Sequence, residues 1–427
     1  MSEEIPGAHE YNFKENRLFD YVKKFSFPRL AGTEGEEKAV KLTEKTFQDL
    51  GYNDKNIHKE SFKFSDFYST TLIKLLMTIN LTFYLILLLF VYIYPFVTIL
   101  ITIFFVIIII LIMRGLKHPE EPGFWGEYYG DILKATNVYT KVFAADLPEE
   151  EAGNIVISAH LDSKSQSYQT AWRVVVYRIW LFGGIALGIF FGFFLLEVFS
   201  PLTLPDLFLT FGIWTSTLVV SFSNVVLMFL NTHNKSPGAI DNASGMAIVF
   251  ELSSYFRDNP LSHYNLWFVQ FSAEELGTMG SRIFLLDHED EFEKGKVYQI
   301  NMDMVSSAEH SFGKNRVEYL KSYGVIPRRK IAPILAKYME KAAEEEGVEI
   351  NGFHLTTGAH LDSVAFHQRG FDAIDITTRA AARWAHSEND TPDKVDPKVL
   401  RDTCIIVKRT ILQLDKEYNK LCNVYEG

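Results

Sequence analysis

Cysteine is nearly absent from this sequence. The two cysteines, Cys404 and Cys422, both lie in the last stretch of the 427 residues, which we predict to be helical. Two thiols in one such stretch do not frame a disulfide-stapled fold. We therefore expect a chain that folds without disulfide bonds, as is typical of a reducing compartment.

An excess of positive charge is also lacking. The chain has 42 Lys and Arg against 53 Asp and Glu, which gives a formal net charge of −11. An acidic chain is repelled by phosphate backbones, so the composition argues against nucleic acid as a partner. Residues 1–10 are polar and acidic and lack an apolar run, so we expect no cleavable secretory signal.

Charge is missing altogether from two long blocks. Residues 75–113 contain no charged side chain, and neither do residues 179–196 and 207–230. A single helix of about 39 residues would be about 58 Å long, nearly twice the ~30 Å hydrocarbon core of a bilayer. We therefore place a break at Tyr94-Pro95. Buried core helices are a poor explanation of such stretches, and the pattern predicts four transmembrane helices in two hairpins.

The two hairpins interrupt a polar domain. We predict hairpins at 71–115 and 173–231, and one polar domain made of 1–70, 116–172 and 232–427. Each hairpin returns the chain to the side it left, so all polar segments share one compartment. Basic residues flank the spans only on that side, at Lys74, Arg114, Lys117, Arg173, Arg178 and Lys235. By the positive-inside rule, we predict that the polar domain is cytoplasmic.

Outside the hairpins, strand and helix patterns alternate. We predict strands at 57–67, 137–143, 154–158, 265–271, 297–302 and 371–377, and helices at 16–24, 34–50, 246–256, 276–286, 329–346 and 392–418. This alternation predicts an α/β fold with a mixed, mostly parallel sheet sandwiched by helices. Ligands of such sheets gather beyond the carboxyl ends of the strands. There the sequence has His160, Glu274, Glu275 and Asp303.

A turn of small residues at 237–245 holds one acidic side chain, Asp241. Alone, such a turn is typical of a loop that caps a helix. Together with His160, Glu275, Asp303 and His386, however, it supplies a set of imidazole and carboxylate ligands without thiolate. Such ligands suit Zn²⁺, with Mn²⁺ or Co²⁺ as alternatives. We assign Asp241 as the bridge between two ions, His160 and Asp303 to one ion, and Glu275 and His386 to the other.

Two further acidic residues receive supporting roles. Asp162, two residues after His160 on extended backbone, would fix the imidazole ring. Glu274 is left without a metal, which suits a general base that takes the proton of a metal-bound water. The resulting hydroxide would attack a carbonyl group polarised by the other ion.

These segments resemble the co-catalytic di-zinc aminopeptidases, metallopeptidase family twenty-eight. The resemblance is carried by 159–163, 238–245, Glu274-Glu275, Asp303, and His386 with Asp390-Thr391-Pro392, and 29–35 resembles the opening segment of the family. It implies the zinc aminopeptidase (phosphorylase/hydrolase-type) fold, two zinc ions, and a peptide substrate cleaved at its N-terminal end.

The sequence departs from the family pattern before the last histidine. Several members have Tyr there to hold the developing oxyanion, whereas this chain has Ala385. The stretch between His160 and Asp241, short in the family, here contains a membrane hairpin. The motif of His160 also recurs letter for letter at 359–363, where we expect His360 to be a rim residue and not a ligand. Arg379 and Arg383 would either bind a substrate carboxylate or pair on the surface.

Two other functions are compatible with the same fold. One is a glutaminyl-cyclase-like acyl transferase that uses a single zinc, and the other is a catalytically silent scaffold. The presence of both His160 and Asp303 completes a two-metal set and favours the peptidase. Carboxypeptidase and dipeptidase action stay open beside aminopeptidase action.

Overall fold

The chain divides into two compact units. The computed structural model describes residues 12–115, 119–120, 130–201, 203–307, 316–324, 328–356 and 361–425. The first unit, here called the sheet unit, comprises Met1–Lys63, Leu133–Ser165 and His233–Gly427, and the second, the helical unit, comprises Phe64–Ile132 and Gln166–Thr232. The hairpins predicted at 71–115 and 173–231 fall inside the segments of the helical unit.

The sheet unit is built on a sheet that has nine strands in the described residues. The strand order is β1-β2-β6-β3-β7-β11-β8-β10, with β9 paired to β8. The four neighbouring strands β6, β3, β7 and β11 are parallel, whereas β2 pairs antiparallel with β6 and β11 pairs antiparallel with β8. The bounds are β1 Ile57–Ser65, β2 Ile132–Val142, β3 Gly153–His160, β6 Tyr264–Phe271, β7 Val297–Met302, β8 Val317–Tyr323, β9 Arg329–Lys330, β10 Ile350–Leu355 and β11 Asp372–Ile376, and β4 Ser165–Gln166 and β5 Thr232–His233 form a separate small sheet.

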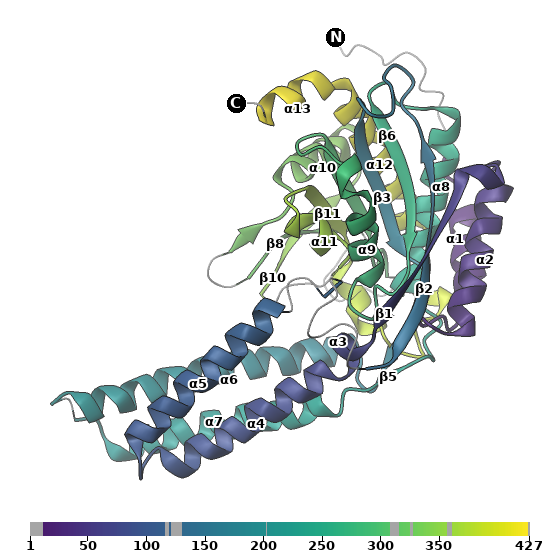
Figure 1. The fold of residues 1–427 in the computed structure, drawn as a ribbon. Helices are drawn as coiled ribbons and strands as arrows, with labels where there is room; N and C mark the ends of the chain where they lie inside the picture. Colours follow the sequence, from purple (N-terminus) through teal and green to yellow (C-terminus); the bar gives the residue numbers. More distant parts are fainter. Residues whose placement is uncertain are drawn as a thin grey trace. The chain divides into compact units, whose positions relative to one another are not determined.

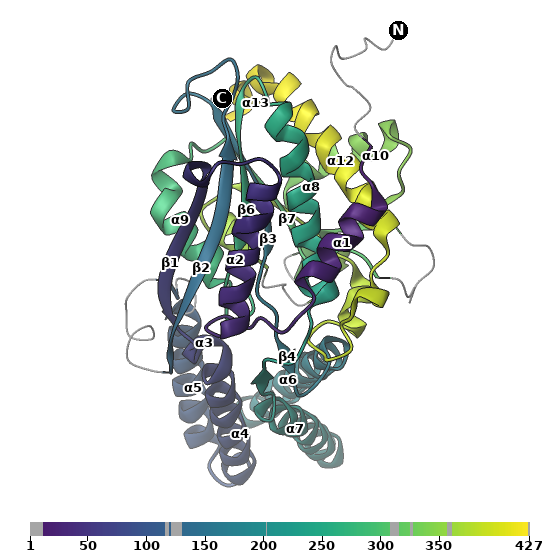
Figure 2. The same cartoon turned by 90° about the vertical axis from the view of Figure 1, so that its right-hand side faces the viewer.

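Helices cover both faces of the sheet (Figures 1 and 2). One face packs against α1 Glu15–Phe25, α2 Glu34–Asp49, α8 Ser244–Asp258, α10 Pro333–Glu345, α12 Pro397–Lys416 and α13 Tyr418–Tyr425. The other packs against α9 Met279–His288 and α11 Ser363–Gln368. The mixed, mostly parallel sheet between helices confirms the predicted fold class.

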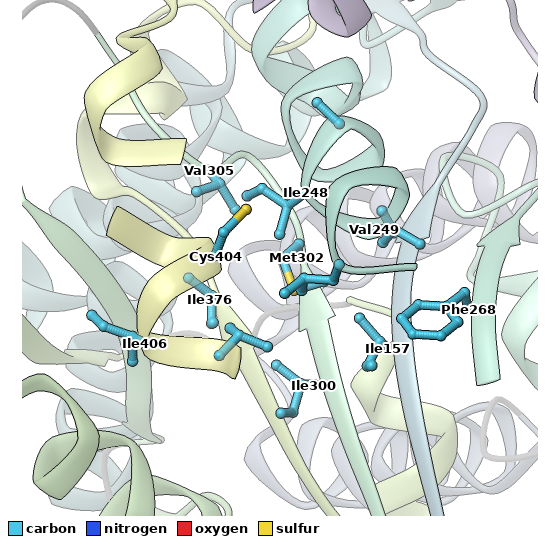
Figure 3. Close-up of a cluster of buried hydrophobic side chains, with 14 of the residues drawn as sticks. Ile157, Ile248, Val249, Phe268, Ile300, Met302, Val305, Ile376, Cys404 and Ile406 are labelled. Carbon is cyan, nitrogen blue, oxygen red and sulfur yellow. The ribbon is translucent and has the colours of Figure 1, made fainter. Parts of the chain in front are cut away.

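The central strands are buried on both faces, which explains their continuous apolar sequences. Along β3, Ile155 and Ile157 enter the core beneath α8 and α12, whereas Val156 faces the opposite core. Figure 3 shows the first of these cores, in which Ile248 of α8 and Cys404 of α12 lie over the strand side chains. The two packed layers fix the carboxyl ends of β3, β6 and β7 at one edge.

The helical unit consists of α3 Phe67–Thr70, α4 Leu72–Phe90, α5 Pro95–Gly115, α6 Thr170–Phe199 and α7 Asp206–Met228 (Figure 1). Four stretches are long and apolar enough to cross a membrane, namely Phe67–Phe90, Pro95–Ile112, Thr170–Phe199 and Asp206–Met228. Helices α6 and α7 pack closely, and a Cβ atom at Gly212 would lie 2.2 Å from the ring of Phe190. The first hairpin turns between Phe90 and Pro95, at the predicted break.

Several predicted elements differ from the observed ones. The helix expected at 329–346 begins only at Pro333, because Arg329–Lys330 pair with β8 as β9. The closing helix expected at 392–418 begins at Pro397, where Asp396 caps the helix by accepting a hydrogen bond from the Lys398 amide. Residues 392–394 form a separate 3-10 turn. Strands β8 and β10 were not predicted.

Candidate metal centre

The predicted site residues lie at the ends of neighbouring elements. His160 is the last residue of β3, Asp303 follows β7, and Glu274 and Glu275 follow β6. Because these three strands are parallel neighbours, their carboxyl ends meet at the same edge of the sheet. Asp241 lies in the turn before α8, and His386 lies in the segment between β11 and α12.

The first cluster contains His160, Asp241 and Asp303, all buried. The Nε2 atom of His160 is 3.2 Å from Oδ1 of Asp241 and 3.5 Å from Oδ1 of Asp303. Within the described residues, neither His160 Nε2 nor Asp303 Oδ1 has a hydrogen-bond partner. Buried polar atoms are rarely left unpaired, so these atoms are suited to a shared cation.

The second cluster contains Asp241, Glu275 and His386. His386 Nε2 lies 3.0 Å from Oε2 of Glu275 and 3.2 Å from Oδ2 of Asp241. Asp241 therefore directs one oxygen to each cluster, as a bridging carboxylate does. Ligands held tetrahedrally at ~2.1 Å from one zinc ion lie about 3.4 Å apart, so both clusters fit this metal in donor type and spacing.

The charges at the centre are unbalanced. The two imidazoles face the carboxylates of Asp241, Glu275 and Asp303 within a buried site. Burial opposes charge on His160, yet Asp303 and Glu274 raise its pKa well above the usual range. Burial likewise raises the pKa of Asp303. A site that favours positive charge on a fully buried imidazole is electrostatically suited to cations.

Glu274 lies beside the clusters without belonging to either. Its side chain is 8% exposed, and Oε2 is 3.9 Å from His160 Nε2. Burial raises its pKa well above the usual range, although His160 opposes the shift. The preceding residue, Ala273, has φ of 57°, and His386 has φ of 62°. Left-handed backbone at residues with a Cβ atom costs ~1–3 kcal/mol, so the surrounding structure must hold both segments in place.

Asp162 holds the segment that carries Glu274. Its carboxylate accepts hydrogen bonds from the backbone N–H groups of Glu274 and Glu275, each at 3.2 Å. The predicted contact with the imidazole is made mainly by the backbone: His160 Nδ1 is 3.1 Å from the Asp162 carbonyl oxygen and 3.5 Å from the carboxylate. Our prediction did not include the anchoring of the acidic pair.

Asp390 anchors the turn that carries Asp241. Its carboxylate accepts hydrogen bonds from the N–H groups of Ile240 at 2.7 Å and Asp241 at 3.0 Å. Burial, with a smaller effect of Asp241, raises the pKa of Asp390 to about 7. The sequence placed Asp390 in a motif but gave it no role, because its partners are backbone groups about 150 residues away.

Arg29 ties together the two loops that follow β3 and precede α8. Its guanidinium group is buried and donates to carbonyl oxygens of Phe25, Phe27, Leu161, Pro237 and Gly238, at 2.6–3.2 Å. Leu161 adjoins His160, and Gly238 belongs to the turn of Asp241. Only its place in a family-like segment pointed to Arg29 in the sequence.

Among the described residues, the others that the sequence analysis singled out belong to neither ligand cluster. His360 lies outside the described residues. Asp362, the fourth residue of the same motif, directly precedes α11 and is buried, and this burial raises its pKa to about 7. Arg379 pairs with Glu318 at 2.6 Å, which favours the surface-pairing alternative. The guanidinium group of Arg383 lies 5.1 Å from the ring of Trp384.

Known proteins resemble this chain in sequence and in structure. Residues 224–411 match the model of peptidase family M28. Aminopeptidase YwaD of Bacillus subtilis (strain 168) is 28% identical over 192 residues, which are 43% of this chain and 39% of that protein. The chain thus matches well under two thirds of the length of this curated relative.

Two solved structures share the fold over nearly their whole length. The aminopeptidase from Aneurinibacillus sp. strain AM-1 has a TM-score of 0.54 at 14% identity, covering 94% of this chain and 93% of that one. A glutaminyl cyclase from an Acidobacteriales bacterium has a TM-score of 0.54 at 13% identity, covering 97% of this chain and 100% of that one. At these identities the likeness concerns the fold alone.

Proposed function

We propose that this chain, whose residues 224–411 match the model of peptidase family M28, is a membrane-anchored zinc aminopeptidase of that family that hydrolyses peptide bonds. The observation that supports the proposal most is the position of Asp241 between two clusters of ligands. A buried carboxylate flanked by two imidazoles is the arrangement that a pair of cations requires, and the curated relative from Bacillus subtilis is named an aminopeptidase.

His160, Asp241 and Asp303 would hold one zinc ion, and Asp241, Glu275 and His386 the other. Zinc, when bound there, lowers the pKa of water and acts as a Lewis acid toward a carbonyl group. The protein keeps the ligands oriented through the backbone bonds that Asp162 and Asp390 accept.

Glu274 is our candidate for the group that moves the proton. Its carboxylate lies beside His160 and is not needed to complete either cluster. Because burial raises its pKa, the protonated form is stable enough to hold the proton that it accepts. The same carboxyl group would then donate this proton to the amine that leaves the cleaved peptide.

We assign the sheet unit to the cytoplasmic side of the membrane. The four candidate spans form two hairpins in sequence, so the segments of the sheet unit share one side. Basic residues flank the spans on this side, including Lys74, Arg114 and Arg173, whereas the hairpin tips have no Lys or Arg. A reporter fused after Gly427 should be active in the cytoplasm, and its detection outside the cell would contradict the assignment.

The proposed activity can be tested with the purified full chain in detergent. Free aminoacyl fluorophores should be hydrolysed and N-terminally blocked ones should not, and a chelator should abolish the reaction until zinc is restored. Glu274→Gln should lower kcat at least about 100-fold, the usual contribution of a general base. The matched control is Glu251→Gln, since Glu251 is a buried glutamate that pairs with Arg17 outside the centre. Wild-type activity in Glu274→Gln would refute the role of Glu274.

The solved glutaminyl cyclases of the same fold make acyl transfer the second candidate. The cyclase alternative uses one zinc ion, whereas the presence of two candidate ligand clusters supports a two-metal centre. Cyclisation of peptides with N-terminal Gln, together with one bound zinc ion per chain and no aminoacyl hydrolysis, would favour the cyclase.

A further inference from the structure

Lys164 is a largely buried cation at one side of the metal centre. It follows Asp162 by two residues, and its side chain is only 12% exposed. The ammonium Nζ lies 2.8 Å from Oε2 of Glu275 and donates to the Glu275 carbonyl oxygen at 2.9 Å. The backbone N–H of Lys164 donates to the other carboxylate oxygen, Oε1, at 3.1 Å. One residue therefore contacts all three oxygens of Glu275.

This contact makes the two ligand clusters chemically unequal. In the cluster of Asp241, Glu275 and His386, the oxygen that faces His386 at 3.0 Å is the same Oε2 that faces the ammonium. In the other cluster, Asp303 Oδ1 and His160 Nε2 have no hydrogen-bond partner among the residues that the structure describes. Within the described residues, the cluster of Asp241, Glu275 and His386 therefore has a lysine ammonium on one of its ligand atoms, whereas the other cluster has none.

We propose that Lys164 makes the Asp241–Glu275–His386 position the weaker of the two, so that the chain binds its two zinc ions in sequence. A divalent ion on Glu275 Oε2 would lie within a few ångströms of the ammonium, in a buried site where like charges repel strongly. Among the described residues, no lysine or arginine forms an ion pair with Asp303. The inference rests on the proposed two-metal centre and adds the order of filling: at limiting zinc, the chain holds one ion, at His160, Asp241 and Asp303.

A zinc titration of the chelator-stripped full chain in detergent tests this order. The wild type should bind zinc in two steps, with the second dissociation constant at least tenfold above the first. Lys164→Met should tighten the second step about tenfold or more and leave the first unchanged. Lys164→Gln, which is neutral but keeps a hydrogen-bond donor, should behave like Lys164→Met. Lys164→Arg keeps the charge and should retain the wild-type separation. Asp303→Asn should remove the tight step and leave the weak one.

Each outcome separates the inference from the function on which it rests. Two equal steps in the wild type, or a second step that is unchanged or weaker in both neutral variants, would overturn the role of Lys164 while leaving the two-metal centre in place. A weaker second step would mean that the ammonium orients Glu275 for the ion instead of opposing it. Zinc binding by neither the wild type nor any variant would overturn both the inference and the proposed metal centre.

Discussion

Replacing Asp162 by Asn tests whether a buried carboxylate holds the acidic pair in place. Each oxygen of Asp162 accepts one backbone N–H, from Glu274 and from Glu275. Asn keeps one acceptor and turns an amide N–H toward the other donor. A hydrogen bond to a charged group contributes ~1.5–3 kcal/mol, and a buried unpaired donor costs ~1–3 kcal/mol. Removing the desolvated charge offsets part of this, so the free energy of unfolding should fall by about 2–4 kcal/mol.

Asp162→Asn should lower turnover as well as stability. A catalytic group that moves by ~1 Å can lose about 100-fold in rate, and Glu274, which we propose as the general base, lies directly on the loosened backbone. At saturating zinc, we expect kcat to fall about 100-fold. Thermal melting in detergent should show a lower Tm by roughly 4–8 °C, at about 2 °C per kcal/mol for a large domain.

Asp372 offers a matched control for this experiment. Its carboxylate also accepts two backbone N–H groups, from Ile334 at 3.3 Å and Leu335 at 3.4 Å at the start of α10, away from the metal centre. Asp372→Asn should lower the Tm but keep the wild-type kcat. Our reasoning would be refuted if Asp162→Asn kept the wild-type Tm and kcat, or if Asp372→Asn lost as much activity.

Two further substitutions test groups that the structure places around the centre. Arg29→Met leaves five carbonyl oxygens in or beside the core without their charged donor. Chemical denaturation should therefore show a loss of at least about 3 kcal/mol, and a wild-type unfolding curve would contradict this. Glu36 accepts hydrogen bonds from the Ser272 hydroxyl and the Thr136 amide, and burial raises its pKa from 4.5 to about 7. Between pH 4.5 and about 7 the folded chain keeps a proton on Glu36 that the unfolded chain releases. The contribution of Glu36 to the free energy of unfolding is therefore full below pH 4.5 and is lost as the pH rises toward 7. Glu36→Gln should therefore match the wild type near pH 4.5 and exceed its stability by roughly 3 kcal/mol at pH 8, at 1.36 kcal/mol per pKa unit, whereas parallel stability curves would exclude a buried titration of Glu36.

The apolar spans and the ligand types follow from sequence because both are local properties. An uncharged stretch such as 75–113 is sufficient to predict membrane-length helices, and Pro95 is sufficient to predict the break between them. The strands β3, β6 and β7 were predicted because strands buried on both faces have continuous apolar sequences. His160 is the last residue of β3, Asp303 directly follows β7, and Glu274 lies three residues after β6. Because parallel strands have their carboxyl ends at the same edge of the sheet, these side chains were expected to lie close together there.

Strands with few apolar residues could not be found in this way. β10 contains Asn351, Gly352 and His354, and it forms a strand because it pairs in register with β8. The short β9 ends the backbone pairing before Pro333, which moves the start of α10 beyond the residue expected from periodicity. Such pairing is decided by partners distant in sequence, and a propensity pattern does not record it.

The sequence by itself determined which side chains could bind metal and which segments are apolar enough to cross a membrane, because both depend on residue type. Only the tertiary structure decided what surrounds those ligands. Asp162 and Asp390 bind backbone N–H groups, Arg29 binds backbone carbonyl oxygens, and Lys164 reaches Glu275 from a loop more than 100 residues away in the chain. Backbone groups are the same in every residue, so a sequence cannot specify which of them a buried charge will meet.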